Sequence, residues 1–93
     1  MYVFQRGETV VLNLEVRDAE NESLVDVNSI IINLYAPNSS LIEEEAMTRN
    51  GTGLYSYDWS IPTNASIGEY KMRLNVSTPS GWIVDDVFFY VEQ

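Results

Sequence analysis

Residues 9–18 read TVVLNLEVRD, and every second residue from Val10 to Val16 is apolar. Successive side chains of a β-strand point to opposite sides, so this spacing gives a strand one apolar face and one polar face. A polar stretch, residues 18–23, follows directly and ends the run. The stretch therefore predicts a strand whose inner face, formed by Val10, Leu12, Leu14 and Val16, covers a core.

Six further runs of this kind are separated by turn residues about every 8 to 12 positions, and none has the period of a long helix. Short strands with regular turns in this number are typical of the immunoglobulin architecture. We therefore predict an all-β fold, a seven-stranded immunoglobulin-like antiparallel β-sandwich. Its other strands are expected at residues 2–5, 29–36, 41–48, 54–61, 69–77 and 82–92.

Alternation within these runs also predicts which side chains face the core. Two local signals refine the pattern: Glu43, Glu44 and Glu45 suit a charged edge strand, and residues 49–53 (RNGTG) carry the Asn-Gly signal of a hairpin turn. The expected inner residues of the later strands are Ile30, Ile32, Leu34, Tyr55, Tyr57, Trp59, Ile61, Tyr70, Met72, Leu74, Val76, Val87, Phe89 and Val91.

Length and charge limit the function classes. The chain has 93 residues, 45% of them hydrophobic, which is enough for one core, so we predict a single domain spanning residues 1–93. Acidic residues outnumber basic ones by 14 to 5, and the formal net charge is −9. Phosphate backbones and anionic lipids repel such a domain at long range. Nucleic-acid binding is therefore not expected.

Cysteine and histidine are both absent. The usual general base, the thiolate nucleophile and most zinc ligands are then missing, so we predict no enzymatic activity and no catalytic residue. The absence of a disulfide favours a bacterial or archaeal surface module, although a cytosolic origin would explain it equally well. The chain has neither a signal peptide nor a run of about 20 apolar residues, so no direct membrane insertion is expected. Because its first and last residues directly adjoin strand-like runs, we expect a module excised from a larger protein.

Three segments carry a family resemblance: residues 4–10 (FQRGETV), residues 51–55 (GTGLY) and residues 61–70 (IPTNASIGEY). In them the chain resembles the bacterial and archaeal immunoglobulin-like domains of cell-surface proteins, of the macroglobulin type or the fibronectin-III-like type. The resemblance implies that Tyr70 forms a tyrosine corner and returns its hydroxyl to the backbone upstream. Met72 stands where antibody domains have their second cysteine. Modules of this kind usually serve as spacers, adhesion units or partner-binding domains.

Five Asn-x-Ser/Thr sequons occur, although eight asparagines and 14 serines and threonines predict only about one by chance. Four lie in expected turns and the fifth on the outward face of a strand, so sugar could be added without disturbing the core. We therefore predict a glycoprotein, the alternative being that turns are simply rich in asparagine and serine. The acceptor residues are Asn21, Asn38, Asn50, Asn64 and Asn75.

Carboxylates around one turn suggest a calcium site, because Ca²⁺ takes about six to eight oxygen ligands, often from closely spaced Asp and Glu. The candidate ligands are Asp18, Glu20, Glu22 and Asp26. Asp85 and Asp86 form a second candidate, although neighbouring residues of a strand point apart. The alternative is a solvated acidic loop with no cofactor.

Aromatic residues offer a possible sugar-stacking surface, since exposed rings on a sandwich face can pack against sugar rings. The candidates are Tyr55, Tyr57, Trp59 and Trp82. Their alternation fits burial in the core equally well. Coplanar, exposed rings would favour carbohydrate binding, and rings packed beneath the opposite sheet would exclude it.

These observations together predict a non-catalytic structural or interaction module, a spacer or adhesion domain, of an acidic, secreted or cell-surface protein. Its expected partners are neighbouring domains of the same chain and, beyond them, other surface proteins or glycans. The isolated domain is expected to be a monomer. The alternative function is a carbohydrate- or calcium-dependent binding module.

Overall fold

The alternating run that begins at Thr9 forms strand β2 (Thr9–Glu15) in a computed structural model that describes residues 1–93. No residue is helical, so the chain has no apolar helix of the length that crosses a membrane. The other strands are β1 (Tyr2–Gln5), β3 (Ser29–Tyr35), β4 (Leu41–Ala46), β5 (Thr48–Gly51), β6 (Leu54–Ser60), β7 (Gly68–Thr78) and β8 (Gly81–Glu92).

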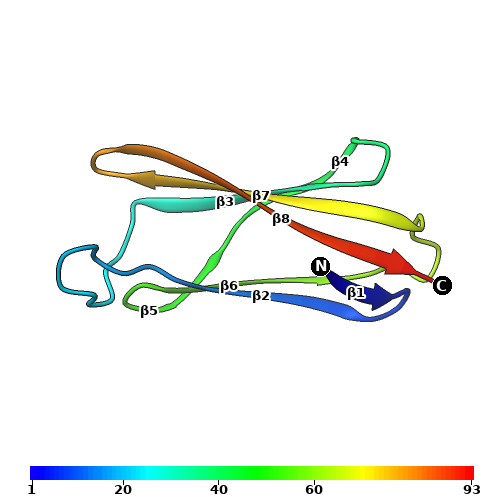
Figure 1. The fold of residues 1–93 in the computed structure, drawn as a ribbon, viewed down its shortest axis with the longest axis horizontal. Coiled ribbons are helices and arrows are strands. Elements are labelled where there is room, and N and C mark those ends of the chain that lie inside the picture. Colours follow the sequence, from blue (N-terminus) through cyan, green and yellow to red (C-terminus); the bar gives the residue numbers. More distant parts are fainter.

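The strands form two sheets that face each other (Figure 1). The larger sheet has the order β1-β8-β7-β3-β4, and the smaller has the order β2-β6-β5. Neighbours are antiparallel except β1 and β8, which run parallel with Tyr2 opposite Phe89. The predicted all-antiparallel sandwich is wrong at this pair, because four residues of alternating sequence carry no information about strand direction.

The strand count is eight and not the predicted seven, because the run at residues 41–48 changes sheet. β4 pairs with β3 in the larger sheet, whereas β5 pairs with β6 in the smaller. Met47 lies buried between them, and its backbone nitrogen donates to the Ile30 oxygen at 2.9 Å. Figure 1 shows this green segment crossing between the layers. The chain stays extended as it crosses, so no turn residue marks the change.

The turn between β5 and β6 lies at Thr52-Gly53, within the predicted turn segment 49–53, while Asn50 and Gly51 still belong to β5. Gly53 has φ +69°, a left-handed conformation that favours glycine. A Cβ atom there would also lie 2.8 Å from the Val16 oxygen. Both constraints fix the turn at Gly53, and Gly51 is left as the last residue of β5.

Most of the predicted inner residues form the buried core, and Leu12, Leu14, Val16 and Val87 are only half-buried against it. Strand β3 alternates between buried and half-buried positions along its whole length, and β7 does so from Tyr70 to Val76. No charged or polar residue is buried. The buried cluster contains Val10, Ile30, Ile32, Leu34, Met47, Tyr55, Tyr57, Trp59, Ile61, Ala65, Tyr70, Met72, Leu74, Val76, Phe89 and Val91.

Tyr70 forms the tyrosine corner that the family resemblance implies. Its hydroxyl donates a hydrogen bond to the Ser66 backbone oxygen at 2.6 Å. Its ring stacks on Phe89, with centroids 5.3 Å apart, and packs on Trp59 from the other sheet at 5.5 Å. Burial raises the pKa of the hydroxyl, so it remains a donor. Tyr70 thus joins the two sheets and fixes the chain between β6 and β7.

Replacing Tyr70 by phenylalanine should lower the free energy of unfolding by about 1 kcal/mol, the usual net value of one hydrogen bond. Tyr90→Phe is the matched control, because Tyr90 is exposed and its hydroxyl makes no hydrogen bond within the chain. Urea unfolding of both variants measures the difference. Equal effects of the two substitutions would show that the corner does not stabilise the fold.

Candidate functional site: the open edge of the sandwich

The expected calcium ligands do not come together. Asp18 Oδ1 accepts hydrogen bonds from the backbone nitrogens of Glu20 and Asn21, at 2.8 and 3.4 Å, so this carboxylate closes its own turn. Asp26 is ion-paired with Arg49. No group of three carboxylates that could hold a metal ion is formed anywhere in the chain. The site predicted at Asp18, Glu20, Glu22 and Asp26 is therefore not assembled.

The carboxylates of the second candidate pair, Asp85 and Asp86, do not converge either. Asp86 Oδ1 accepts from Arg73 Nε at 2.9 Å, and this contact lowers the pKa of Asp86. Asp85 points elsewhere and accepts from the Asp86 backbone nitrogen at 3.0 Å. The two side chains lie on opposite faces of β8, as the strand geometry predicts.

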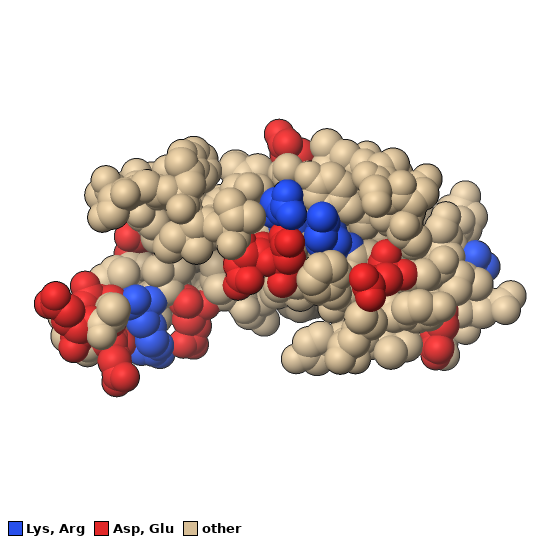
Figure 2. All heavy atoms as spheres, turned by 45° about the horizontal axis from the view of Figure 1, so that its top comes forward, with Lys and Arg blue, Asp and Glu red and all other residues tan.

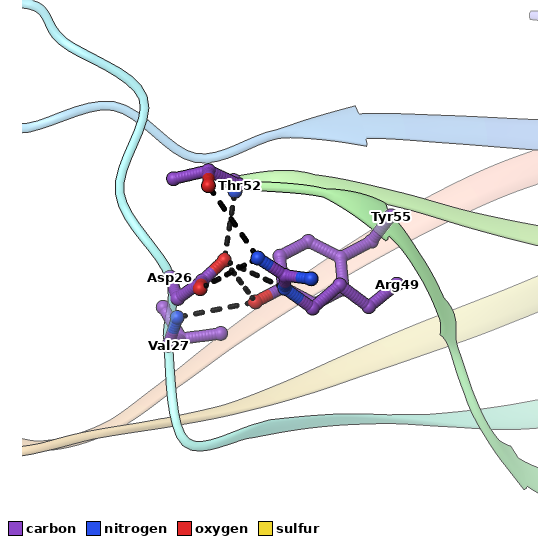
Figure 3. Close-up of polar contacts among 6 residues, drawn as sticks. Asp26, Val27, Arg49, Thr52 and Tyr55 are labelled. Carbon is purple, nitrogen blue, oxygen red and sulfur yellow. Dashed lines mark hydrogen bonds and ion pairs between the residues drawn. The ribbon is translucent and has the colours of Figure 1, made fainter.

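Asp26 is the centre of a polar cluster that ties the β2–β3 segment to the β5–β6 hairpin (Figure 3). Its carboxylate accepts from Arg49 Nε and Nη2, both at 3.1 Å, and from the Gly53 backbone nitrogen at 2.9 Å. The Tyr55 hydroxyl lies 3.5 Å from Asp26 Oδ1 and accepts from the Val27 backbone nitrogen at 3.2 Å. The hydrogen bonds from Arg49 hold the pKa of Asp26 below its ordinary value. The cluster fastens two loops and leaves no free ligand oxygens directed at a common point.

Three of the four candidate sugar-stacking residues are buried. Tyr55, Tyr57 and Trp59 lie under the opposite sheet, with Trp59 only 7% exposed, so their rings offer no face to a ligand. The Tyr57 hydroxyl reaches across to β4 and donates to Glu43 Oε1 at 2.6 Å, and burial together with this carboxylate raises its pKa. Trp82 differs, because it is 66% exposed. The predicted four-residue stacking surface is therefore reduced to one tryptophan.

One side of the sandwich is open. β1 pairs with β8 only from Phe89 to Glu92, so residues 82–88 of β8 have no partner on that side. β2 pairs only with β6 and forms the facing margin of the smaller sheet. We call these two margins the open edge. Between them lies an apolar groove of about 350 Å³, lined by Tyr2, Phe4, Val10, Val11, Leu12, Asn13, Met72, Val87 and Phe89.

Exposed apolar residues continue along β8 to the β7–β8 turn, with Trp82 and Val84 on its outer face and Ile83 on its inner face. Trp82 is 66% exposed, and Ile83 and Val84 are each 56% exposed. We call these three residues the Trp82 patch. Ile83 shares the inner face of β8 with Val87 and Phe89, so its exposure means that the smaller sheet does not extend beneath it. In Figure 1 this hairpin projects at the left, at the end of the molecule opposite the C-terminus.

A shallow hollow of about 280 Å³ lies beside Trp82 on the outer face of the larger sheet, lined also by Ile31, Asn33, Glu44 and Asn75. Asn33 Oδ1 is buried without a hydrogen-bond partner. Asn75 is not free to bind, because its amide nitrogen donates to the Ile31 oxygen at 3.2 Å. The hollow thus places the Trp82 ring beside polar groups, some of which are already hydrogen-bonded within the chain.

Most of the few basic side chains lie beside acidic ones. Figure 2 shows that most basic side chains on the visible face lie beside acidic ones, while much of that face is uncharged. Three of the five basic residues are ion-paired, in the pairs Arg17–Glu15, Arg49–Asp26 and Arg73–Asp86. Lys71 instead lies over the ring of Tyr35, 4.8 Å from its centroid. The three ion pairs engage only three of the 14 acidic residues, so most carboxylates have no basic partner.

Sequence reasoning found Trp82 but not Ile83 and Val84, nor the groove. A signal was present, because three consecutive apolar residues directly after a turn cannot all face one core. Arg49, the partner of Asp26, was also missed. The two residues are 23 positions apart, and nothing local pairs them.

The sequence profile of a family described as MG2 domain matches residues 2–88. The curated protein α2-macroglobulin of Escherichia coli (strain K12) is 29% identical over 73 residues, which cover 78% of this chain and 4% of that protein.

Solved structures are similar over nearly the whole chain. A crystal structure of Salmonella α2-macroglobulin reacted with methylamine has a TM-score of 0.80 at 23% identity and covers 98% of this chain. A structure of Escherichia coli α2-macroglobulin activated by porcine elastase has a TM-score of 0.76 at 25% identity and covers 96%. This chain corresponds to 6% and 8% of those two chains, so it spans less than a tenth of the relatives that it matches.

Asp26→Asn should remove a pH-dependent part of the stability. Because the folded-state pKa of Asp26 is lowered, its contribution is present above the unfolded-state pKa and is lost as pH falls through the folded-state value. The stability difference between the original chain and the variant should therefore shrink below about pH 4. Urea unfolding at a series of pH values tests this, with Asp58→Asn, an exposed residue outside any ion pair, as control. A difference that persists unchanged to the lowest pH would contradict it.

Proposed function

Because the chain belongs to the MG2 domain family of macroglobulin-type immunoglobulin-like modules, we propose that it is a non-catalytic structural module of a longer, α2-macroglobulin-like protein. Its role there is to hold and contact neighbouring domains of the same polypeptide. The open edge, with its groove and the Trp82 patch, is the contact surface. The module lacks histidine and cysteine, the usual general base and thiolate nucleophile of enzymes.

The observation that carries this proposal is the exposure of Trp82, Ile83 and Val84 on an unpaired margin of β8. An exposed apolar edge strand readily pairs with other chains, and soluble proteins usually cover or charge such edges. Full burial of each side chain of this size would contribute roughly 1.5 to 3 kcal/mol. Binding of a partner domain over the patch would be stabilised by this burial. It would also prevent the exposed edge strand from pairing with other chains.

The occupant that we propose is another domain of the same chain and not a second copy of this one. Two copies, each with a formal charge of −9, would repel one another. The relatives also contain far more chain than this module, since it corresponds to 4% of the curated protein. The isolated module should accordingly be a monomer.

The shape of the module fits a bridging role. It measures 43 × 20 × 20 Å, and the Trp82 patch lies near one end of the long axis (Figure 1). The C-terminus lies at the other end. A neighbour joined through the C-terminus and one docked on the Trp82 patch would therefore be held apart along the length of the domain.

The setting that we propose is secreted or cell-surface, where a spacer or adhesion role would apply. Escherichia coli relatives have been solved in forms described as activated by porcine elastase and by trypsin. We therefore propose that the longer protein carrying this module also meets proteinases, while the module itself contributes architecture.

Carbohydrate binding is a second candidate, favoured by one observation. Trp82 borders the hollow that holds Glu44 and the unpartnered Asn33 Oδ1, a combination of ring and polar groups suited to a sugar. The two candidates make opposite demands on Trp82. A sugar site must stay accessible in the longer protein, whereas a contact surface must be covered.

Hydrogen exchange provides the test. In the isolated chain the amides of residues 82–88 should exchange rapidly where they face the open edge, and in the longer protein they should be protected. Trp82→Ser should lower the melting temperature of the longer protein by several degrees and leave the isolated chain within about 0.5 kcal/mol of its original stability. Leu41→Ser, at another exposed apolar position, is the control and should change neither.

Equal exchange of residues 82–88 in the isolated chain and in the longer protein would overturn the contact-surface proposal. If a soluble oligosaccharide then changed the emission of Trp82 saturably, the carbohydrate candidate would replace it. Trp59 does not interfere with this measurement, because it is buried and keeps a constant contribution.

A further inference from the structure

The five sequons play no part in the proposed contact role, and their number exceeds the roughly one expected by chance. The five sequons differ in whether the asparagine Nδ2 atom donates a hydrogen bond within the chain. This freedom matters because the amide nitrogen is the atom that receives a glycan.

Asn21 and Asn38 share one local geometry. Each side-chain Oδ1 accepts a hydrogen bond from the backbone nitrogen of the serine two residues on, at 3.0 Å in both cases. The hydroxyl of the same serine, Ser23 or Ser40, donates to that oxygen at 2.6 and 2.7 Å. Both asparagines are exposed, and neither Nδ2 atom donates to any group of the chain. The nitrogen that would be modified is therefore free.

The side-chain amide of Asn64 is also free, but without the local hydrogen bonds that Asn21 and Asn38 accept. It lies in the turn between β6 and β7, is exposed, and makes no side-chain hydrogen bond. Its hydroxyl residue, Ser66, is also exposed. The Ser66 backbone oxygen accepts from Tyr70, so the turn is held from its inner side while the sequon faces solvent.

Asn50 and Asn75 have engaged amides. Asn75 is half-buried, and its Nδ2 donates to the Ile31 oxygen at 3.2 Å and lies 3.5 Å from the Arg73 oxygen. Asn50 lies in β5, and its Nδ2 donates to Ser56 Oγ at 2.8 Å. A glycan at either position would displace contacts that hold neighbouring strands.

The three free sequons also avoid the open edge. None of the five lies in β1, β2 or β8, the strands that border the groove and carry the Trp82 patch. Asn21 lies in the β2–β3 loop, Asn38 in the β3–β4 turn and Asn64 in the β6–β7 loop. A large hydrated sugar at these turns would therefore leave the apolar margin uncovered.

We propose that Asn21, Asn38 and Asn64 are N-glycosylation sites, and that Asn50 and Asn75 remain unmodified. The co-substrate is an oligosaccharide linked through phosphate or diphosphate to a polyprenyl lipid. The asparagine Nδ2 attacks C1 of the first sugar, the N–C1 bond forms as the C1–O bond to the phosphate breaks, and the amide loses one proton. The polyprenyl phosphate or diphosphate leaves with the bonding electron pair.

Glycopeptide mass spectrometry of the protein from its own host tests the assignment. Cleavage after Lys and Arg combined with cleavage before Asp places each sequon on its own peptide, namely 18–25, 26–49, 50–57, 58–71 and 74–84. Fragmentation by electron transfer keeps the sugar attached and locates it. Peptides 18–25, 26–49 and 58–71 should carry a glycan, and peptides 50–57 and 74–84 should not.

Paired variants separate sequon chemistry from loop structure. Ser40→Thr keeps both the hydroxyl and the sequon, so Asn38 should remain glycosylated. Ser40→Ala should abolish the glycan at Asn38 and leave Asn21 and Asn64 occupied. Unmodified peptides at all three turns, or a glycan at Asn75 in place of those at the turns, would overturn the proposal. Neither result bears on hydrogen exchange at the open edge, so the proposed function fails or survives separately.

Discussion

The contact of Tyr70 with Trp59 and Phe89 is the interaction on which the rest of the sandwich depends. Tyr70 and Phe89 belong to the larger sheet and Trp59 to the smaller, so this aromatic group fastens one layer to the other. Antibody-type domains have a disulfide at this level, but here Met72 takes the cysteine position and the chain has no cysteine. Non-covalent contacts, chiefly apolar packing, must therefore hold the two sheets together. The Tyr70 hydroxyl extends the same interaction to the backbone at Ser66, which fixes where β7 begins.

Two further tyrosines also combine a buried ring with a hydrogen-bonded hydroxyl. Tyr57 keeps its ring in the core and sends its hydroxyl to Glu43 of β4, and Tyr55 does the same toward Asp26 and Val27. Each connects the smaller sheet to a segment that packing alone would hold loosely. Because the rings are buried while the polar partners stay near the surface, no charge has to be taken out of water. At Asp26 the carboxylate is occupied by the Arg49 guanidinium and the Gly53 backbone nitrogen.

Periodicity predicted the facing of side chains well, because it depends only on the strand's own geometry. Every inner residue expected in β3, β6 and β7 is buried, and the corner at Tyr70 followed from the family resemblance. What failed depends on partners distant in sequence. The sheet change at Met47, the parallel direction of β1 and the pairing of Asp26 with Arg49 have no local signature. The predicted calcium ligands do not converge for a local reason, because Asp18 accepts hydrogen bonds from backbone nitrogens two and three residues away. The exposure of Trp82 required the relative lengths of two sheets, which no single strand reveals.

The edges of the larger sheet at β4 and β8 differ in how charge protects them, and the difference supports the proposed contact surface at β8. At β4 the margin carries Glu43, Glu44 and Glu45, and like charges there oppose pairing with another strand. At β8 the acidic residues Asp85 and Asp86 come only after Trp82, Ile83 and Val84, and Asp86 is neutralised by Arg73. Charge thus protects the first margin and leaves the start of the second apolar. A margin left in this state is consistent with a fold in which contact by another domain, and not solvent, completes the sheet.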